Sequence, residues 1–173
     1  MKRSRRAMTI VAAIAAMGTT AAAQASLSPG TLFPGIRAQP RLPAAVANFE
    51  RHYGQLRYVG TTSDMVVADW GSRELLINPE TRQPLGTASV TFTAHVYTSS
   101  SSSTRAVECE AINVDSEGWA ASWTGRQATA ASGWQDLSIG TLPVSVWGFG
   151  TVMECTMNRY SKIGTFFTYA QAT

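Results

Sequence analysis

Two short stretches decide the fold of this chain: VECEA (Val107–Ala111) and WGFGTVMEC (Trp147–Cys155). They carry the only two cysteines among the 173 residues. Side chains in a β-strand alternate between two faces, so Cys109 shares its face with apolar neighbours and the two glutamates take the other face. In the second stretch the apolar face consists of Trp147, Phe149, Met153 and Cys155. Both sulfurs should therefore point into the same interior, which is typical of a β-sandwich held by a disulfide.

The first 25 residues have the pattern of a signal peptide. Basic residues gather in Lys2–Arg6, a short apolar segment follows at Met8–Met17, and small residues end in Ala23-Gln24-Ala25, an A-x-A cleavage site before Ser26. The apolar segment is too short to cross a bilayer as a helix, so we expect a cleaved leader and no transmembrane segment after cleavage. The sequence predicts a secreted or periplasmic protein of bacterial type, exported through the general or the twin-arginine route.

The charge of the chain changes once this leader is removed. The full sequence is formally +3, with fourteen basic and eleven acidic residues. Four basic residues lie in the leader and every acidic residue follows it, so the predicted mature chain of 148 residues has a formal charge of −1. The high isoelectric point belongs to the leader, and we expect no nucleic-acid or anionic-membrane partner. A chain of this length typically forms one domain.

We expect a disulfide between Cys109 and Cys155, because two cysteines in an exported chain are usually bonded to each other. The bond would close a loop of 47 residues, counted from one cysteine through the other. Such a loop is worth about 4 kcal/mol in the chain-entropy description. Metal binding needs more ligands than two thiols and the scattered His52 and His95, and a catalytic thiol needs an adjacent base.

The segment between the leader and the first cysteine divides by composition. Ser26–Pro43 contains four prolines and two glycines, and we expect an extended lead-in without ladder strands, because proline cannot donate a backbone hydrogen bond. Ala44–Tyr53 fits a short helix, with the start of a strand as the alternative. We therefore place one β-sandwich domain at residues 44–173.

Short β-type segments separated by turn residues fill this domain. The clearest is Ala88–Thr98, in which every second residue from Val90 to Val96 should face inward. Five serines, Ser99–Ser103, then form a loop that we expect to be mobile. The other predicted strands lie at Leu56–Tyr58, Met65–Trp70, Glu74–Asn78, Gly118–Gln127, Trp134–Ile139, Trp147–Cys155 and Lys162–Gln171, with a turn at Gly140–Pro143. The pattern predicts an all-β fold, an antiparallel sandwich of jelly-roll or immunoglobulin-like type.

The second half of the chain resembles a loosely defined group of uncharacterised secreted single-domain proteins of myxobacteria and similar bacteria. The residues that carry the resemblance are the Val107-Glu108-Cys109 strand, the aromatic and glycine-rich strand Trp147–Cys155, and the closing segment Asn158–Tyr169. The group usually has a further upstream cysteine, which this chain lacks. The resemblance implies an extracellular β-sandwich. It supplies no catalytic residues, because no activity is established for the group.

Candidate catalytic residues are few. The sequence has no G-x-S-x-G motif, and neither His52 nor His95 has a partner that would complete a triad. Glu108 and Glu110 stand two residues apart on the outward face of one strand, which brings their carboxyl groups within the separation of about 5 to 9 Å that glycosidases use. A half-exposed strand gives the same pattern without function, so a glycan hydrolase is the least favoured hypothesis.

Asn113, Asp115 and Glu117 place oxygen ligands at alternate positions before Gly118, as in the first half of a calcium loop. The twelfth position of such a loop would be Thr124 rather than glutamate. A hairpin turn needs asparagine, aspartate and glycine in any case. We therefore expect no cofactor and keep calcium as an alternative.

Trp119, Trp123 and Trp134 are the candidate ligand-binding residues. Trp119 and Trp123 lie four residues apart and hence on one face of a strand, and Trp134 faces away from Leu137 and Ile139. Exposed indoles would form a flat platform for sugar rings or for a protein partner. Tryptophans of sandwich domains are more often buried, so the sequence favours a place in the core.

These observations predict a non-enzymatic exported protein that acts as a surface, matrix or interaction module. A carbohydrate-binding module that uses the three tryptophans is the first alternative, and a glycan hydrolase is the second. The expected partner is a polysaccharide or a protein at the cell surface. Exposed tryptophans would favour the carbohydrate-binding alternative.

Overall fold

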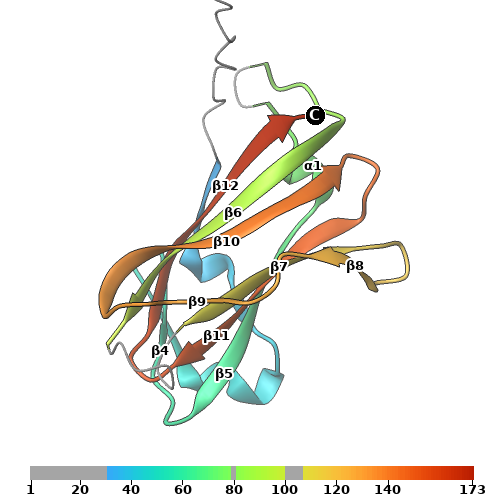
Figure 1. Cartoon of the computed structure of the whole chain (residues 1–173). Coiled ribbons are helices and arrows are strands. Elements are labelled where there is room, and N and C mark those ends of the chain that lie inside the picture. Colours follow the sequence, from blue (N-terminus) through green and yellow to red (C-terminus); the bar gives the residue numbers. More distant parts are fainter. Residues whose placement is uncertain (1–30, 79–80, 100–106) are drawn as a thin grey trace, which may run out of the picture.

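The computed structural model describes residues 31–78, 81–99 and 107–173, so the predicted signal peptide (1–25) and most of the serine loop (Ser99–Ser103) lie outside the described residues. The described chain forms two antiparallel sheets that pack face to face, which confirms the predicted β-sandwich (Figure 1). Figure 1 shows β12, β6 and β10 side by side in one layer, with β5, β11 and β7 in the other.

The first sheet, called the β6 sheet, has the strand order β10-β6-β12-β4-β3, and β1 also pairs with β12. Its strands are β1 (Thr31–Pro34), β3 (Phe49–His52), β4 (Gln55–Tyr58), β6 (Thr87–Thr98), β10 (Gly133–Ser145) and β12 (Lys162–Ala172). The second sheet, called the β11 sheet, has the order β2-β5-β11-β7-β8, and β9 also pairs with β7. Its strands are β2 (Gln39–Pro40), β5 (Ser63–Trp70), β7 (Glu108–Val114), β8 (Ala120–Trp123), β9 (Gln127–Ala128) and β11 (Gly150–Asn158). The described helices are the 3-10 helices η1 (Gly35–Arg37) and η2 (Pro43–Asn48) and the α-helix α1 (Ser72–Leu75).

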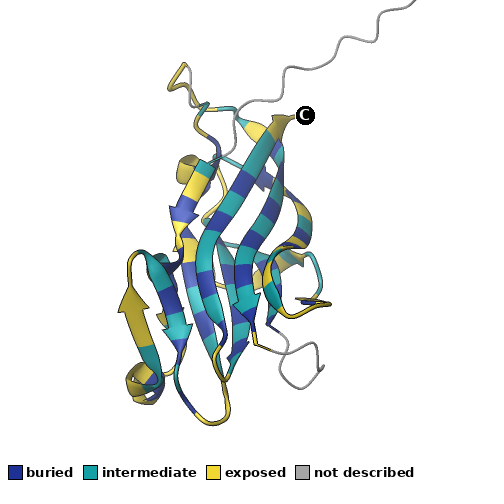
Figure 2. Cartoon of the chain, turned by 90° about the vertical axis from the view of Figure 1, so that its left-hand side faces the viewer, coloured by how far each residue is buried: buried dark blue, intermediate teal, exposed yellow. Residues whose placement is uncertain are grey.

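The core lies between the two sheets and follows from strand alternation. Every second residue of β6 from Val90 to Val96 is fully buried, as predicted, and the residues between them are half-buried. Figure 2 shows the same alternation as bands of buried and intermediate residues along the strands next to the C-terminus. Large rings complete the core, since Trp70 contacts Phe33 and Phe166 with ring centroids 5.2 and 5.5 Å apart.

Cys109 on β7 and Cys155 on β11 form a disulfide, which confirms the predicted bond. The two residues stand directly opposite each other in the register of these strands, with their Cα atoms 4.1 Å apart. The bond therefore joins neighbouring strands of one sheet. Both cysteines belong to the buried core, which explains the apolar face of the VECEA stretch.

The expectation that the proline-rich segment contains no ladder strands is wrong. Thr31–Pro34 forms β1, which pairs with β12, and Gln39–Pro40 forms β2, which pairs with β5. Each of these strands has a single neighbour. Such a strand tolerates proline, because half of its N–H groups have no ladder partner. The segment therefore contributes one strand to each sheet.

The helix predicted at Ala44–Tyr53 is shorter than expected. A 3-10 helix covers Pro43–Asn48, and strand β3 begins at Phe49, whose ring contacts Tyr58 of β4 at 5.1 Å. Tyr53 has a positive φ of 48° and ends the strand in a turn.

The strand predicted at Glu74–Asn78 is also wrong, because helix α1 covers Ser72–Leu75. Leu75 and Leu76 are consecutive and both buried, at 3% and 0% exposed. Two neighbouring buried side chains do not fit the alternation of a strand with one solvent face.

The turn predicted at Gly140–Pro143 is wrong, because β10 continues to Ser145 through a bulge just before Gly140, whose φ is 127°. The actual turn comes later, between β10 and β11. Trp147 and Phe149 lie in it and are 84% and 64% exposed, so they do not share the inward face of the cysteine strand. Within β10, the residues after the bulge face the side of the sheet opposite to the one that unbroken alternation predicts.

Candidate functional site

The three candidate tryptophans are exposed, which overturns the expectation that they lie in the core. Trp119, Trp123 and Trp134 have 70%, 61% and 41% of their surface exposed. They do not form one platform, however. Trp123 ends β8 in the β11 sheet, Trp119 precedes that strand, and Trp134 lies on β10 in the β6 sheet.

Trp134 is held by other rings on the outer face of the β6 sheet. Its indole stacks on the imidazole of His95, with ring centroids 4.8 Å apart and an angle of 3° between the ring planes. Tyr97, which is paired with Trp134 in the strand register, contacts the indole at 5.6 Å. His95 is itself oriented by Asp136, whose Oδ1 lies 2.7 Å from its Nδ1. Contacts of this kind fix the ring before any ligand arrives.

A glycine on β12 makes room for this ring. The register of β12 shifts between Ile163 and Thr165, so Gly164 is the extra residue of a bulge. A Cβ atom at Gly164 would lie 3.1 Å from Cζ3 of Trp134 and 3.4 Å from Cδ2 of His95. The indole therefore extends from β10 across β6 and reaches the backbone of β12.

These residues line a hollow of about 510 Å³, called the Trp134 hollow below. The β3–β4 turn contributes Tyr53, which is 91% exposed, and β4 contributes Gln55. The full lining is Pro34, Tyr53, Gly54, Gln55, His95, Trp134, Gly164 and Thr165. The hollow thus combines two exposed aromatic side chains with amide, hydroxyl and imidazole groups, which is the usual make-up of a small-molecule site.

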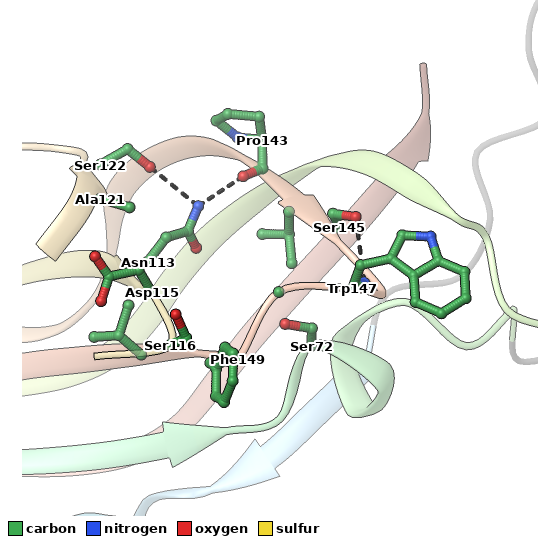
Figure 3. A pocket seen from close by; sticks show the side chains of 14 residues that line it. Ser72, Asn113, Asp115, Ser116, Ala121, Ser122, Pro143, Ser145, Trp147 and Phe149 are labelled. Atoms are coloured by element: carbon green, nitrogen blue, oxygen red, sulfur yellow. Dashed lines mark hydrogen bonds between the residues drawn. The ribbon is translucent and has the colours of Figure 1, made fainter. Parts of the chain in front are cut away.

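A second hollow, of about 410 Å³, lies at one end of the sandwich beside the β7–β8 and β10–β11 turns (Figure 3). Asn113 is fully engaged there: its Nδ2 donates to Ser122 Oγ and to the Pro143 carbonyl, and its Oδ1 accepts a hydrogen bond from Thr151. Figure 3 shows the indole of Trp147 pointing away from Asn113. The polar groups at one end of this hollow are therefore bonded to one another, and the other end is aromatic.

Asp115, the central residue of the calcium alternative, is used within the hairpin. Oδ1 of Asp115 accepts hydrogen bonds from the backbone N–H groups of Glu117 and Trp119, at 3.0 and 2.8 Å. Gly118 follows with a φ of 81°, as a tight turn requires. The turn thus accounts for the pattern that suggested calcium. Within residues 31–78, 81–99 and 107–173, no group of three or more His, Cys, Asp and Glu side chains could hold a metal ion.

Glu108 and Glu110 share an arginine on the outer face of the β11 sheet. Arg126 donates to Oε1 of Glu110 from Nη2 at 2.7 Å and from Nε at 3.2 Å, and its Nη1 lies 4.0 Å from Glu108. The hydrogen bond to Glu110 is the main reason why the pKa of Arg126 is raised, so the guanidinium stays charged. The two carboxylates thus form an ion-pair cluster with Arg126, which accounts for their spacing without the acid and nucleophile roles of a glycosidase.

Sequence reasoning named Trp134 but missed Tyr53, Gly164 and the stacking role of His95. Alternation along Ala88–Thr98, with Val90 to Val96 inward, predicts an outward His95, and its half-buried place on β6 confirms this. Its contact with Trp134 depends on the pairing of β10 with β6, which no local sequence signal contains. The position of Tyr53 depends on its positive φ.

None of the helices in the described parts of the chain is both long and apolar enough to cross a membrane.

No family model and no curated protein matches this chain. Among solved structures, it is similar to the carbohydrate-binding module CBM6cm-2 of Cellvibrio mixtus lichenase 5A in complex with cellotriose, with 10% identity, a TM-score of 0.48, and coverage of 82% of this chain and 97% of that one. It is also similar to the Podospora anserina GH26-CBM35 β-(1,4)-mannanase, with 8% identity and a TM-score of 0.48; 84% of this chain spans only 28% of the mannanase chain. A third similar structure is TmCBM61 in complex with β-1,4-galactotriose, with 11% identity, a TM-score of 0.39, and coverage of 84% and 90%. At these identities and TM-scores the similarity assigns no ligand to this chain, and the resemblance to uncharacterised bacterial secreted proteins stays a prediction.

Proposed function

We propose that the protein is an exported, non-catalytic module that binds a polysaccharide in the Trp134 hollow. The observation that carries the proposal is the fixed and exposed ring of Trp134, which stacks on His95 and lies over Gly164 while 41% of its surface remains exposed. A ring that is already oriented loses little conformational entropy when a ligand binds.

The chemistry of the hollow suits a sugar. The C–H face of a pyranose ring is apolar and packs against an aromatic ring, whereas its hydroxyl groups need hydrogen-bond partners at the rim. Trp134 and Tyr53 offer the aromatic surfaces, and Gln55 and Thr165 offer the polar groups. Export is supported by the predicted leader and by the Cys109–Cys155 disulfide, since such bonds persist in oxidising compartments.

Isothermal titration calorimetry of the exported form against a panel of soluble polysaccharides tests this function. Trp134→Ala should abolish the binding of every polysaccharide that titrates with the unchanged protein. Trp123→Ala is the matched control, because it removes an exposed indole from the other sheet. Binding that survives Trp134→Ala but not Trp123→Ala would move the site to β8, and a panel without a single binder would reject the function.

A second candidate function is attachment to a protein partner through the turn between β10 and β11. The observation in its favour is that Trp147 and Phe149 are 84% and 64% exposed in one short turn. Exposed aromatic side chains of this size are typical of binding surfaces. Trp147→Ala should then release the protein from the cell surface while leaving the polysaccharide titrations unchanged.

A further inference from the structure

A cationic hollow adjoins the Trp134 hollow on the outer face of the β6 sheet. It has a volume of about 500 Å³, and Gln55 lines both hollows. Its lining residues are Glu50, Arg51, His52, Gln55, Arg57 and Lys162. Arg57, Lys162 and Glu50 share one face of the sheet next to the aromatic site, whereas Arg51 pairs with the buried Leu56 and faces the other side.

The strand register explains how the aromatic and cationic side chains come to lie side by side. In one row across the sheet, Trp134 of β10 pairs with Tyr97 of β6, which pairs with Lys162 of β12, which pairs with Arg57 of β4. Directly paired residues face the same side of a sheet. A ligand that leaves the Trp134 ring along this row thus meets Lys162 two strands away, roughly 10 Å from β10.

Two of these cations have unused binding capacity. Nζ of Lys162 lies 5.2 Å from the centroid of the Tyr97 ring, and no carboxylate of the described residues lies within ion-pair distance of it. Arg57 is 3.7 Å from Glu50, but its Nε is buried and has no hydrogen-bond partner within the described parts of the chain. Because this Nε is enclosed, a ligand can reach Arg57 only through the exposed part of its side chain, which amounts to 44%.

The cations continue around the β3 edge of the sandwich. Arg51 lines both the cationic hollow and a third hollow of about 760 Å³, which Arg37 and Arg41 also line. Arg37 is bound by Glu74 and Arg41 lies 3.7 Å from Glu154, whereas Arg51 has no ion pair among the described residues. Asp69 also lines the third hollow, so Arg51 is the one arginine there without an ion pair among the described residues.

We propose that the polysaccharide is acidic, with carboxylate groups of uronic-acid type that are bound by Lys162 and Arg57 while a neighbouring sugar ring packs on Trp134. The inference rests on the proposed function of the Trp134 hollow and adds the class of its ligand. Guanidinium and ammonium groups form charge-assisted hydrogen bonds with carboxylates, and an aromatic ring beside them favours a sugar over a simple anion.

A polysaccharide fits this surface better than a nucleic acid does. Glu50 and Asp136 lie on the same face, at the two ends of the rows that contain the cations and His95. Between these carboxylates the row offers two cations, Lys162 and Arg57. Nucleic-acid binding also depends on many phosphate contacts, each made by a cation.

The test compares polygalacturonate with the same polymer after methyl esterification, which removes the charge and keeps the sugar backbone, and it adds alginate as a second acidic probe. Calorimetry of the unchanged protein should give at least tenfold tighter binding of an acidic polymer than of the ester, and this preference should shrink as salt is raised. Lys162→Gln should remove about tenfold of the affinity for the acidic polymer and leave binding of the ester unchanged. Arg73→Gln on α1 is the matched control, because Arg73 lines none of these three hollows.

The outcomes separate this inference from the function on which it rests. The acidic polymer and the ester could bind equally well, with binding lost in Trp134→Ala and unchanged in Lys162→Gln. That outcome would overturn the proposal that the ligand is acidic and leave the proposed polysaccharide binding intact. A failure of acidic and neutral polysaccharides alike to bind would overturn both. A single-stranded oligonucleotide that binds as tightly as polygalacturonate would also overturn the inference, because the surface would then attract polyanions in general.

Discussion

The indole of Trp134 lies over the backbone of Gly164, although the two residues belong to β10 and β12 and β6 runs between them (Figure 1). The contact is possible because residue 164 has no side chain: a Cβ atom there would lie 3.1 Å from Cζ3 of Trp134. The Trp134 ring can therefore take this position only because residue 164 has no side chain, although β12 does not pair with β10.

Gly164→Ala should consequently displace the indole and lower polysaccharide affinity several-fold. The new methyl group meets a half-exposed side chain that can move away, so the free energy of unfolding should change by less than about 1 kcal/mol. The Trp134 Nε1–H resonance in a two-dimensional NMR spectrum should shift even without a ligand. An unmoved resonance together with unchanged affinity would show that the glycine does not position the ring.

The fold could be predicted from the sequence wherever the alternation of apolar and polar residues is regular. The prediction fails where bulges next to glycines interrupt that alternation. The regular run Ala88–Thr98 and the spacing around Cys109 were sufficient for β6, β7 and the sandwich class. Because of the bulge before Gly140, the sequence of the single strand β10 was interpreted as a shorter strand followed by a turn. The bulge at Gly164 has a larger consequence, because it brings Trp134 to β12, and only the order of the strands in space shows that.

The disulfide should contribute a large part of the stability. Cys109 and Cys155 are 46 positions apart, so replacing both by alanine releases a long loop in the unfolded state and should lower the free energy of unfolding by about 4 kcal/mol. Urea denaturation followed by circular dichroism measures the loss. Because the bond lies in the β11 sheet and the Trp134 hollow in the β6 sheet, polysaccharide affinity of the folded variant should be unchanged. A loss below about 1 kcal/mol would contradict the loop-closure account.

Stability should fall in alkaline solution through Tyr58. Burial raises the pKa of its phenol above the ordinary value of 10.0, and the nearby Asp64, 3.1 Å from the hydroxyl, acts in the same direction. A pKa that is higher in the folded state than in the unfolded state means that the contribution is complete below about pH 10 and is lost as the pH rises through the folded-state pKa.

Tyr58→Phe removes this ionisation, while Asp64 keeps its 2.8 Å hydrogen bond from Asn48. The free energy of unfolding, measured in urea from pH 8 to pH 11, should decline less steeply for the variant than for the unchanged protein. Parallel curves would mean that another group causes the alkaline loss.

Gly35 offers the sharpest test that the proline-rich segment belongs to the sandwich. A Cβ atom at this position would lie 2.1 Å from the carbonyl oxygen of Ile163 and 3.0 Å from that of Gly164. Both are backbone atoms of β12, so they cannot rotate away as a side chain could. Gly35→Ala should therefore lower the free energy of unfolding by about 1 to 3 kcal/mol. It should also weaken polysaccharide binding, because the strained atoms belong to the bulge under Trp134.

Gly71→Ala is the matched control for this change. Gly71 has a φ of −66°, which alanine adopts freely, and a Cβ atom there would meet nothing within 4 Å. The free energy of unfolding of the Gly71→Ala variant should stay the same or rise slightly, because alanine restricts the unfolded chain. If both variants behave alike in urea denaturation, the segment around Gly35 does not pack on β12 in solution. A loss confined to Gly35→Ala, in stability and in affinity together, would show that helix η1 packs against the β12 bulge that lines the Trp134 hollow.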